Sequence, residues 1–152
     1  MPFLAEARVD IDAPPEVVFD TLADHPSWKD WMPRSFVVAS PATGPHYVGN
    51  RFTVRVAGLP FPSSIKIVAF DKPRMLAWAG GARGVLHGHH EFRLSSNGKG
   101  GTTVVSSERW SGIVARLVRP VLKAAAERVG REQLDGLTRG CRSRAQSSAG
   151  IR

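Results

Sequence analysis

The chain has 152 residues, a single cysteine and a formal net charge of +8. This length predicts one domain that buries roughly 70% of its unfolded surface, and a single cysteine excludes an internal disulfide. The sequence has no run of ~18 apolar residues that could span a membrane and no signal-peptide pattern at its start, so we expect a cytoplasmic protein without stable membrane insertion.

The first part of the chain predicts one strand and two short helices. Apolar and polar residues alternate in FLAEARVDID, which indicates a strand at or near a sheet edge. Pro14 and Pro15 suit the first turn of a helix that ends before Pro26. In the next segment, SWKDWM, Trp28 and Trp31 lie three residues apart and share one side. We expect this pair in the core and leave open whether one of them borders a cavity.

Alternation predicts further strands at residues 35–40, 49–58, 64–70, 74–80, 85–94 and 101–110. In the second of these, Phe52 shares one face with Val54 and Val56. The glycines of WAGGARGVLHG do not form a dinucleotide-binding fingerprint, because a strand rather than a helix follows them. Asn97 and Gly98 provide the turn between the last two strands.

A long C-terminal helix beginning near Ser111 is the element on which we expect the sheet to pack. Pro120 predicts either a kink in this helix or the start of a new segment. The apolar face of the helix recurs every three or four residues and consists of Val114, Leu117, Val118, Val121, Leu122, Ala125, Val129, Leu137 and Cys141. A curved antiparallel sheet lying against this stripe would enclose a pocket.

The positive charge is concentrated in the same segment. Residues 1–112 carry 12 Lys/Arg and 10 Asp/Glu, whereas residues 113–152 carry 9 and 3. We interpret the excess as a solvated helix face, because most of these basic residues fall off the apolar stripe. Contact with a partner protein or an anionic surface is the alternative. Nucleic-acid binding is not expected, because no aromatic-plus-basic strand motif accompanies the charge.

The order of the motifs carries a resemblance to a known family. The run IDAPPEVVFDTLADHPSWKDWMP, followed by strands, LAWAGG, GHHEFRL and TTVVSSERWSG before the long helix, resembles the SRPBCC (START-like, helix-grip) superfamily, most closely its polyketide cyclase/dehydrase-like branch. The resemblance implies an α+β helix-grip fold: a strongly curved antiparallel sheet of six or seven strands around a long C-terminal helix, with two short helices after the first strand. Residues 1–146 would form this single START-like domain, followed by a polar tail at 147–152.

The same resemblance implies a deep, mainly apolar cavity between helix and sheet. Members of the superfamily use such cavities for lipids, sterols, polyketides or hormones, and a minority carry out cyclisation, dehydration or aromatisation. The superfamily lacks one shared catalytic set, so the resemblance assigns no catalytic residue here.

The last two strands supply the most specific candidate site. Strand parity gives two inward rows, which are Leu86, His90, Phe92, Leu94 and Thr102, Val104, Ser106, Glu108, Trp110. If Leu94 lies near Thr102, His90 lies opposite Ser106 and one diagonal step from Glu108. A histidine and a glutamate in an otherwise apolar row must pair with each other or with water.

His90 and Glu108 are therefore the candidate functional pair. We favour contact with a ligand; the alternatives are a structural polar pair and general acid–base catalysis on a carbonyl or hydroxyl group. The full set of expected ligand contacts is Trp31, Phe52, Trp78, His90, Phe92, Ser106, Glu108, Trp110, Leu117, Val121 and Ala125.

Neither a metal nor another cofactor is expected. His87 and His89 share the outward face of their strand while His90 points the other way, so the three cannot converge on one ion. Cys141 is expected to be a small core residue rather than a nucleophile.

The function predicted from these observations is binding of a small hydrophobic molecule. A polyketide cyclase or dehydratase using the same cavity is the first alternative, and an interaction protein using the basic helix face is the second. A homodimer is left open, because nothing in the sequence bears on the oligomeric state.

Overall fold

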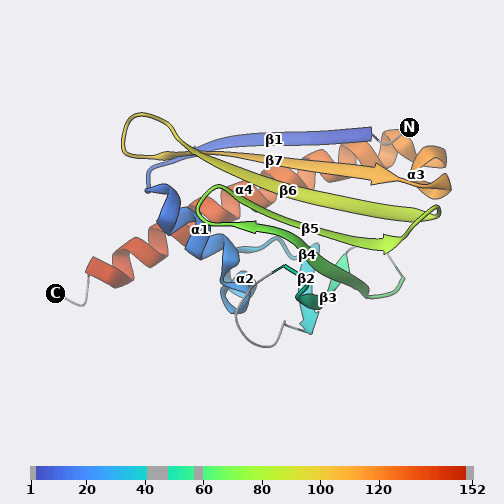
Figure 1. The fold of residues 1–152 in the computed structure, drawn as a ribbon, viewed down its shortest axis with the longest axis horizontal. Helices are drawn as coiled ribbons and strands as arrows, with labels where there is room; N and C mark the ends of the chain where they lie inside the picture. The colour runs from blue at the N-terminus through green and yellow to red at the C-terminus, as the bar shows by residue number, and fades with distance from the viewer. Residues whose placement is uncertain (1–2, 41–47, 57–59, 150–152) are drawn as a thin grey trace.

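Seven antiparallel strands and one long helix dominate this computed structural model (Figure 1), which describes residues 3–40, 48–56 and 60–149. The strands are β1 (Phe3–Ile11), β2 (Phe36–Ser40), β3 (Arg51–Val56), β4 (Ser63–Asp71), β5 (Met75–Ala82), β6 (Leu86–Ser96) and β7 (Thr102–Ser111). They form one sheet in the order β1-β7-β6-β5-β4-β3-β2. The predicted helix-grip fold is confirmed, with β1 at a sheet edge as its alternation indicated.

Two short helices and one helical turn follow β1, as predicted. They are α1 (Pro15–Ala23), η1 (His25–Ser27) and α2 (Trp28–Trp31). Pro15 occupies the first position of α1, where its missing N–H needs no partner, and the carbonyl of Pro14 accepts hydrogen bonds from the N–H groups of Val17 and Val18. The helix buries Val18 completely, so its apolar face belongs to the core.

The C-terminal segment forms two helices, α3 (Ile113–Leu117) and α4 (Arg119–Ala149), rather than one. Between them Val118 leaves helical geometry, with φ −106° and ψ 19°. Pro120 then stands in the first turn of α4, where the absence of an N–H breaks no hydrogen bond. Of the two alternatives for Pro120, the start of a new segment is therefore correct. Helix α4 includes residues 147–149 of the predicted polar tail, and residues 150–152 lie outside the described part.

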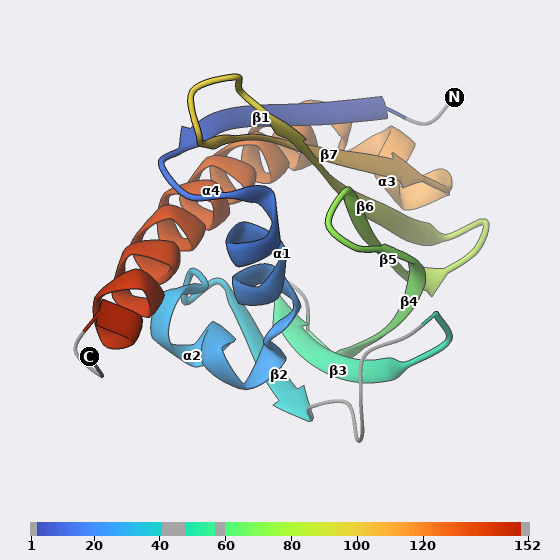
Figure 2. The same ribbon diagram turned by 60° about the vertical axis from the view of Figure 1, so that its left-hand side comes forward.

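The sheet curls around α4, which crosses its open side (Figure 2). Helix α4 contacts β1 and β7 of the sheet and also α1 and α2. Helix α3 lies at the opposite end of the molecule from α1 and α2 (Figures 1 and 2) and is fixed to the β5–β6 turn, because the N–H groups of Ile113 and Val114 donate to the carbonyls of Gly84 and Val85, each at 3.0 Å. In the part of the chain that the structure describes, no helix is long and apolar enough to cross a membrane.

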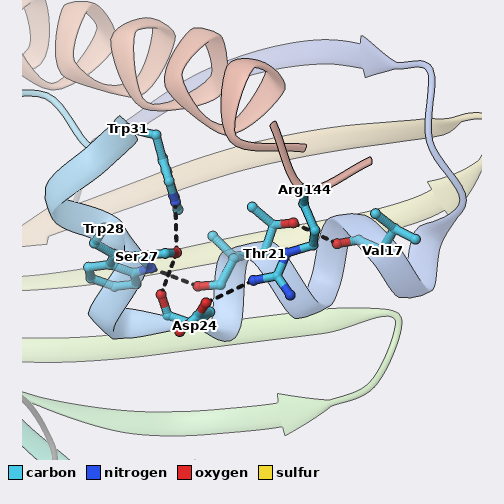
Figure 3. A network of polar contacts seen from close by, with 8 residues as sticks. Val17, Thr21, Asp24, Ser27, Trp28, Trp31 and Arg144 are labelled. Carbon is cyan, nitrogen blue, oxygen red and sulfur yellow. Dashed lines mark hydrogen bonds and ion pairs between the residues drawn. The ribbon is translucent and has the colours of Figure 1, made fainter. Parts of the chain in front are cut away.

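The end of the molecule formed by α1, α2 and the last turns of α4 is densely packed. The indole N–H of Trp28 donates to the carbonyl of Leu22 at 2.9 Å, and that of Trp31 donates to Ser27 Oγ at 3.2 Å (Figure 3). Arg144 of α4 reaches Asp24 at the end of α1, with 2.8 Å between Nη2 and Oδ2. The tryptophan hydrogen bonds hold α1 and α2 together, and the Arg144–Asp24 contact joins the last turns of α4 to them.

Candidate functional site

A cavity of about 490 Å³ lies between the inner face of the sheet, α3 and the first half of α4. Its apolar wall includes Phe36, Val54, Val56, Ile65, Trp78 and Trp110 from the sheet and Val114, Val118, Val121, Leu122, Ala125 and Val129 from the helices. The space exists because small residues face it from both sides. Ala125 and Ala126 keep the helix thin, and Gly88 lets the ring of Trp110 lie against β6, where an added Cβ would come within 3.1 Å of the indole.

A polar group interrupts this apolar wall where β6 and β7 pair. His90 is buried, and its Nε2 lies 2.7 Å from Ser106 Oγ. Its Nδ1 lies 3.2 Å from Glu108 Oε1, although the angle is not that of a hydrogen bond. His90 and Glu108 both line the cavity, and the side chain of Glu108 is 16% exposed. The pair therefore offers a ligand a carboxylate and a histidine edge in otherwise apolar surroundings.

The register of this hairpin differs from the predicted one by two residues. Leu94 pairs with Val104 rather than lying near Thr102, so His90 is directly opposite Glu108. The reason is the turn, in which Asn97 Oδ1 accepts hydrogen bonds from the N–H groups of Lys99 and Gly101. This Asx-type turn pairs Ser96 with Thr102, so β6 extends two residues beyond its predicted end at Leu94.

Aromatic rings fix the orientation of His90. Its imidazole stacks on Phe92, with ring centroids 4.4 Å apart and planes at 22°, and Trp78 flanks it at 4.9 Å. A hydroxyl, an imidazole and a carboxylate follow one another in the order of a catalytic triad. Ser106, however, is buried and does not line the cavity. Its hydroxyl is therefore hydrogen-bonded to the ring of His90 and cannot contact a ligand in the cavity.

The cavity wall contains part of the predicted ligand-binding set. The members that line it are Trp78, His90, Glu108, Trp110, Val121 and Ala125. Phe92 and Ser106 lie behind the wall, in contact with His90. Val54, Val56 and Ile65 also line the cavity, although they are not in the predicted set. The alternation of β3 placed Val54 and Val56 on the same face as Phe52 but did not show which of the three reaches the cavity.

Trp31, Phe52 and Leu117 were also expected to contact a ligand, but they do not line this cavity. Trp31 is buried beneath α4, where Gly136 and Gly140 lie against it. Phe52 packs in the core on the ring of Trp28, with centroids 5.6 Å apart. Leu117 is 78% exposed, because the break at Val118 ends the continuous stripe that would have turned it inward.

Two further titratable side chains, Cys141 in the core and His89 at the cavity wall, have shifted pKa values. Cys141 is buried, and burial raises the pKa of its thiol, which disfavours the reactive thiolate. Burial also lowers the pKa of His89. Among residues 3–40, 48–56 and 60–149, no group of three or more His, Cys, Asp or Glu side chains is placed to hold a metal ion.

Comparison with known proteins identifies the family and the fold of the chain. The sequence model of the family described as polyketide cyclase / dehydrase and lipid transport matches residues 2–142. This match confirms the resemblance inferred from the sequence. No curated protein sequence matches this chain.

Several solved structures share the fold. The ZhuI aromatase/cyclase from a Streptomyces species is 20% identical with a TM-score of 0.73, covering 95% of this chain and 96% of that one. Norcoclaurine synthase from Thalictrum flavum is 11% identical with a TM-score of 0.75, covering 95% and 97%. A hypothetical protein from Helicobacter pylori is 20% identical with a TM-score of 0.73, covering 90% and 86%. At these identities the likeness establishes the fold alone.

Proposed function

The chain belongs to the polyketide cyclase / dehydrase and lipid transport family, and we propose that it binds a small hydrophobic ligand of lipid, polyketide-like or aromatic character. The observation that carries this proposal is the cavity of about 490 Å³ with its mainly apolar wall. Ligand sites typically occupy roughly 300–1,000 Å³ and combine apolar walls with a few polar groups. A cavity of this kind leaves packing contacts unmade, so a ligand that fills it gains them.

The polar pair His90 and Glu108 gives the ligand an orientation. A hydroxyl or other hydrogen-bond donor on the ligand would meet the Glu108 carboxylate, which is only partly exposed. The rest of the ligand would lie against Trp78 and Trp110, whose rings provide flat apolar surfaces. The preferred ligand is therefore amphipathic, with one polar end directed toward β6 and β7.

Native mass spectrometry of the purified protein, compared with its denatured mass, is the first test. A co-purifying apolar molecule would show that the protein carries a ligand and would identify the ligand class. Titration with an uncharged fluorescent apolar probe such as N-phenyl-1-naphthylamine then reports access to the cavity.

A matched pair of variants localises that binding. Ala125→Trp places an indole in the cavity wall and should reduce probe binding by at least about tenfold while leaving the circular dichroism spectrum unchanged. Ala124→Trp, one residue earlier on the exposed face of α4, should bind like the wild type. Equal binding by both variants would place the ligand elsewhere and overturn the proposal.

A cyclase or dehydratase reaction is a second candidate, favoured by the position of His90 between Ser106 and Glu108 in the cavity wall. One member of the pair would accept a proton from the carbon beside a ligand carbonyl, and a proton would be returned to a β-hydroxyl group, which leaves as water. An aromatic β-hydroxyketone is a suitable probe, because its dehydration produces a conjugated enone that absorbs in the ultraviolet.

The His90→Ala variant separates the two candidates. Loss of turnover with probe binding retained would identify catalysis, whereas retention of both would make the histidine structural. Ser106→Ala is the companion variant, because it removes only the hydroxyl that holds the imidazole. If the wild type gives no enone while it binds the probe, the binding function stands alone.

A further inference from the structure

A group of exposed apolar side chains surrounds the helical side of the cavity mouth. We call it the mouth collar; it consists of Val85 (50% exposed), Ile113 (60%), Leu117 (78%), Val118 (43%) and Val121 (74%). These are five of the ten large apolar side chains that are exposed in the described part of the chain. Isolated exposed apolar residues are ordinary, but four of them within residues 113–121 and a fifth in the adjoining β5–β6 turn indicate an interaction surface.

The mouth collar is continuous with the cavity and held in a fixed shape. Val118 and Val121 belong to the collar and also line the cavity. Val85 and Ile113 are kept side by side by the backbone hydrogen bonds between the β5–β6 turn and the start of α3. The break at Val118 turns Leu117 outward, so the same feature that overturned its predicted position places it in the collar.

Basic side chains without acidic neighbours in sequence flank the collar. Arg83 precedes Val85, Arg116 and Arg119 stand on either side of the helix break, and Lys123 follows on α4; all four are exposed. The sequence has no Asp or Glu from residue 72 to residue 90 or from residue 113 to residue 126. The first acidic residue after the collar is Glu127, which pairs with Lys123 at 3.2 Å.

From this combination we propose that the mouth collar docks the protein peripherally on an anionic phospholipid surface. Short apolar side chains beside arginines match the two layers of such a surface, in which acyl chains lie below negatively charged headgroups. Leu117 and Ile113 enter the apolar boundary, while Arg116 and Arg119 meet the headgroups. Docking in this orientation points the cavity mouth at the membrane, so that an apolar ligand can pass between them without crossing water.

The charge argues for a membrane over a second copy of this chain. A symmetric dimer through the collar would bring Arg116, Arg119 and Lys123 of two copies together, and juxtaposed like charges oppose association. An anionic surface instead attracts each of these charges. Each arginine near such a surface increases the membrane-binding constant roughly fivefold. An acidic protein partner with an apolar centre would use the same side chains, and the experiment separates it, because only membrane docking predicts binding to vesicles made of lipid alone.

Vesicle co-sedimentation of the whole chain tests the proposal. Phosphatidylcholine vesicles with about one-third phosphatidylglycerol should sediment the wild type at low salt, whereas pure phosphatidylcholine vesicles or high salt should leave most of it in solution. The Ile113→Ser/Leu117→Ser variant should bind at least about tenfold more weakly, because both side chains lose their burial in the lipid. Arg116→Ser/Arg119→Ser should lose about 25-fold on the anionic vesicles.

A control variant, Val37→Ser/Val68→Ser, removes two exposed valines of β2 and β4 outside the collar and should sediment like the wild type. The proposal is overturned if the wild type does not sediment with anionic vesicles or if the Ile113→Ser/Leu117→Ser variant sediments equally well. It is also overturned if light scattering finds a wild-type dimer that this variant dissociates, because the collar would then bind a second copy.

Ile113 and Leu117 do not line the cavity, so binding of the fluorescent probe in solution should be unchanged in their variant. Loss of vesicle binding with probe binding intact supports docking and leaves the cavity function in place. Failure of the probe to bind the wild type, with vesicle binding intact, would instead refute the cavity function alone.

Discussion

The two halves of α4 meet the rest of the molecule in opposite ways. In the first half Ala125 and Val129 line the cavity while Gly130 lies on β1 with room for a methyl group, whereas the second half packs tightly on α1 and α2. Two glycines show the difference. A Cβ at Gly130 would find only ordinary contacts, at 3.6 Å from Ala7, but a Cβ at Gly136 would overlap the backbone carbonyl of Trp31. One helix thus serves as a wall over the hollow end and as an anchor at the packed end.

Tight packing of the second half of α4 offsets the stability that is lost where the first half borders the cavity. Leu134 and Leu137 of α4 are fully buried at the packed end, together with Trp28 and Phe19. Hydrophobic burial scales with apolar area removed from water, so this end supplies most of the stability that α4 contributes. We therefore expect substitutions at the packed end to change the free energy of unfolding and equivalent substitutions at the hollow end to change it little.

The largest expected effect comes from a pair of leucines on the C-terminal helices. Leu137→Ala removes a fully buried side chain and should lower the free energy of unfolding by roughly 3–5 kcal/mol through lost burial and a new cavity. Leu117→Ala, on the exposed side of α3, should change it by less than about 0.5 kcal/mol. Urea denaturation followed by circular dichroism measures both, and similar losses would contradict the division of the molecule into two ends.

A pair of glycines sharpens the comparison within α4 itself. Gly136→Ala should destabilise by about 2–3 kcal/mol, because the new methyl group forces α4 away from Trp31. Gly130→Ala meets no obstruction and should stabilise by about 0.5–1 kcal/mol through improved helix propensity. The midpoint temperature of thermal unfolding should therefore fall for Gly136→Ala and rise for Gly130→Ala. Shifts of the same sign would mean that packing at the two positions is alike.

The sequence predicted the fold better than it predicted the site. Alternation identified the strands because each has one buried face, and the order of motifs identified the curved sheet around a C-terminal helix. Which residues reach the cavity depended on two local details, the Asx-type turn at Asn97 and the helix break at Val118. The turn moved the register by two residues but left each side chain on its predicted face of the sheet, so His90 and Glu108 still lie together. The helix break left the side chain of Leu117 exposed rather than facing inward.

Close packing is the part that residue patterns could not supply. In the sequence, Gly136 and Gly140 are simply residues of low helix propensity. Their importance is visible only in the structure, where Trp31 packs so closely against both that a larger side chain would not fit. For the same reason Trp31 and Phe52 could not be told from cavity residues, because an aromatic side chain on an inward face fits a solid core and a cavity wall equally well.

The smallest expected effect concerns an ion pair that joins the last part of α4 to α1. Arg144 and Asp24 meet at 2.8 Å, but both side chains are more than one-third exposed, so solvent screens their attraction. A double-mutant cycle with Arg144→Ala and Asp24→Ala should give a coupling energy of about 0.5–1 kcal/mol that falls at high salt. The matched pair at the other half of the helix, Arg128 and Glu132, is longer at 3.8 Å and more exposed. Its coupling should stay below about 0.5 kcal/mol, since it connects neighbouring turns of one helix and holds no second element in place. Equal couplings would mean that Arg144 does not help to anchor α4, and that burial of the leucines alone accounts for the stability of the packed end.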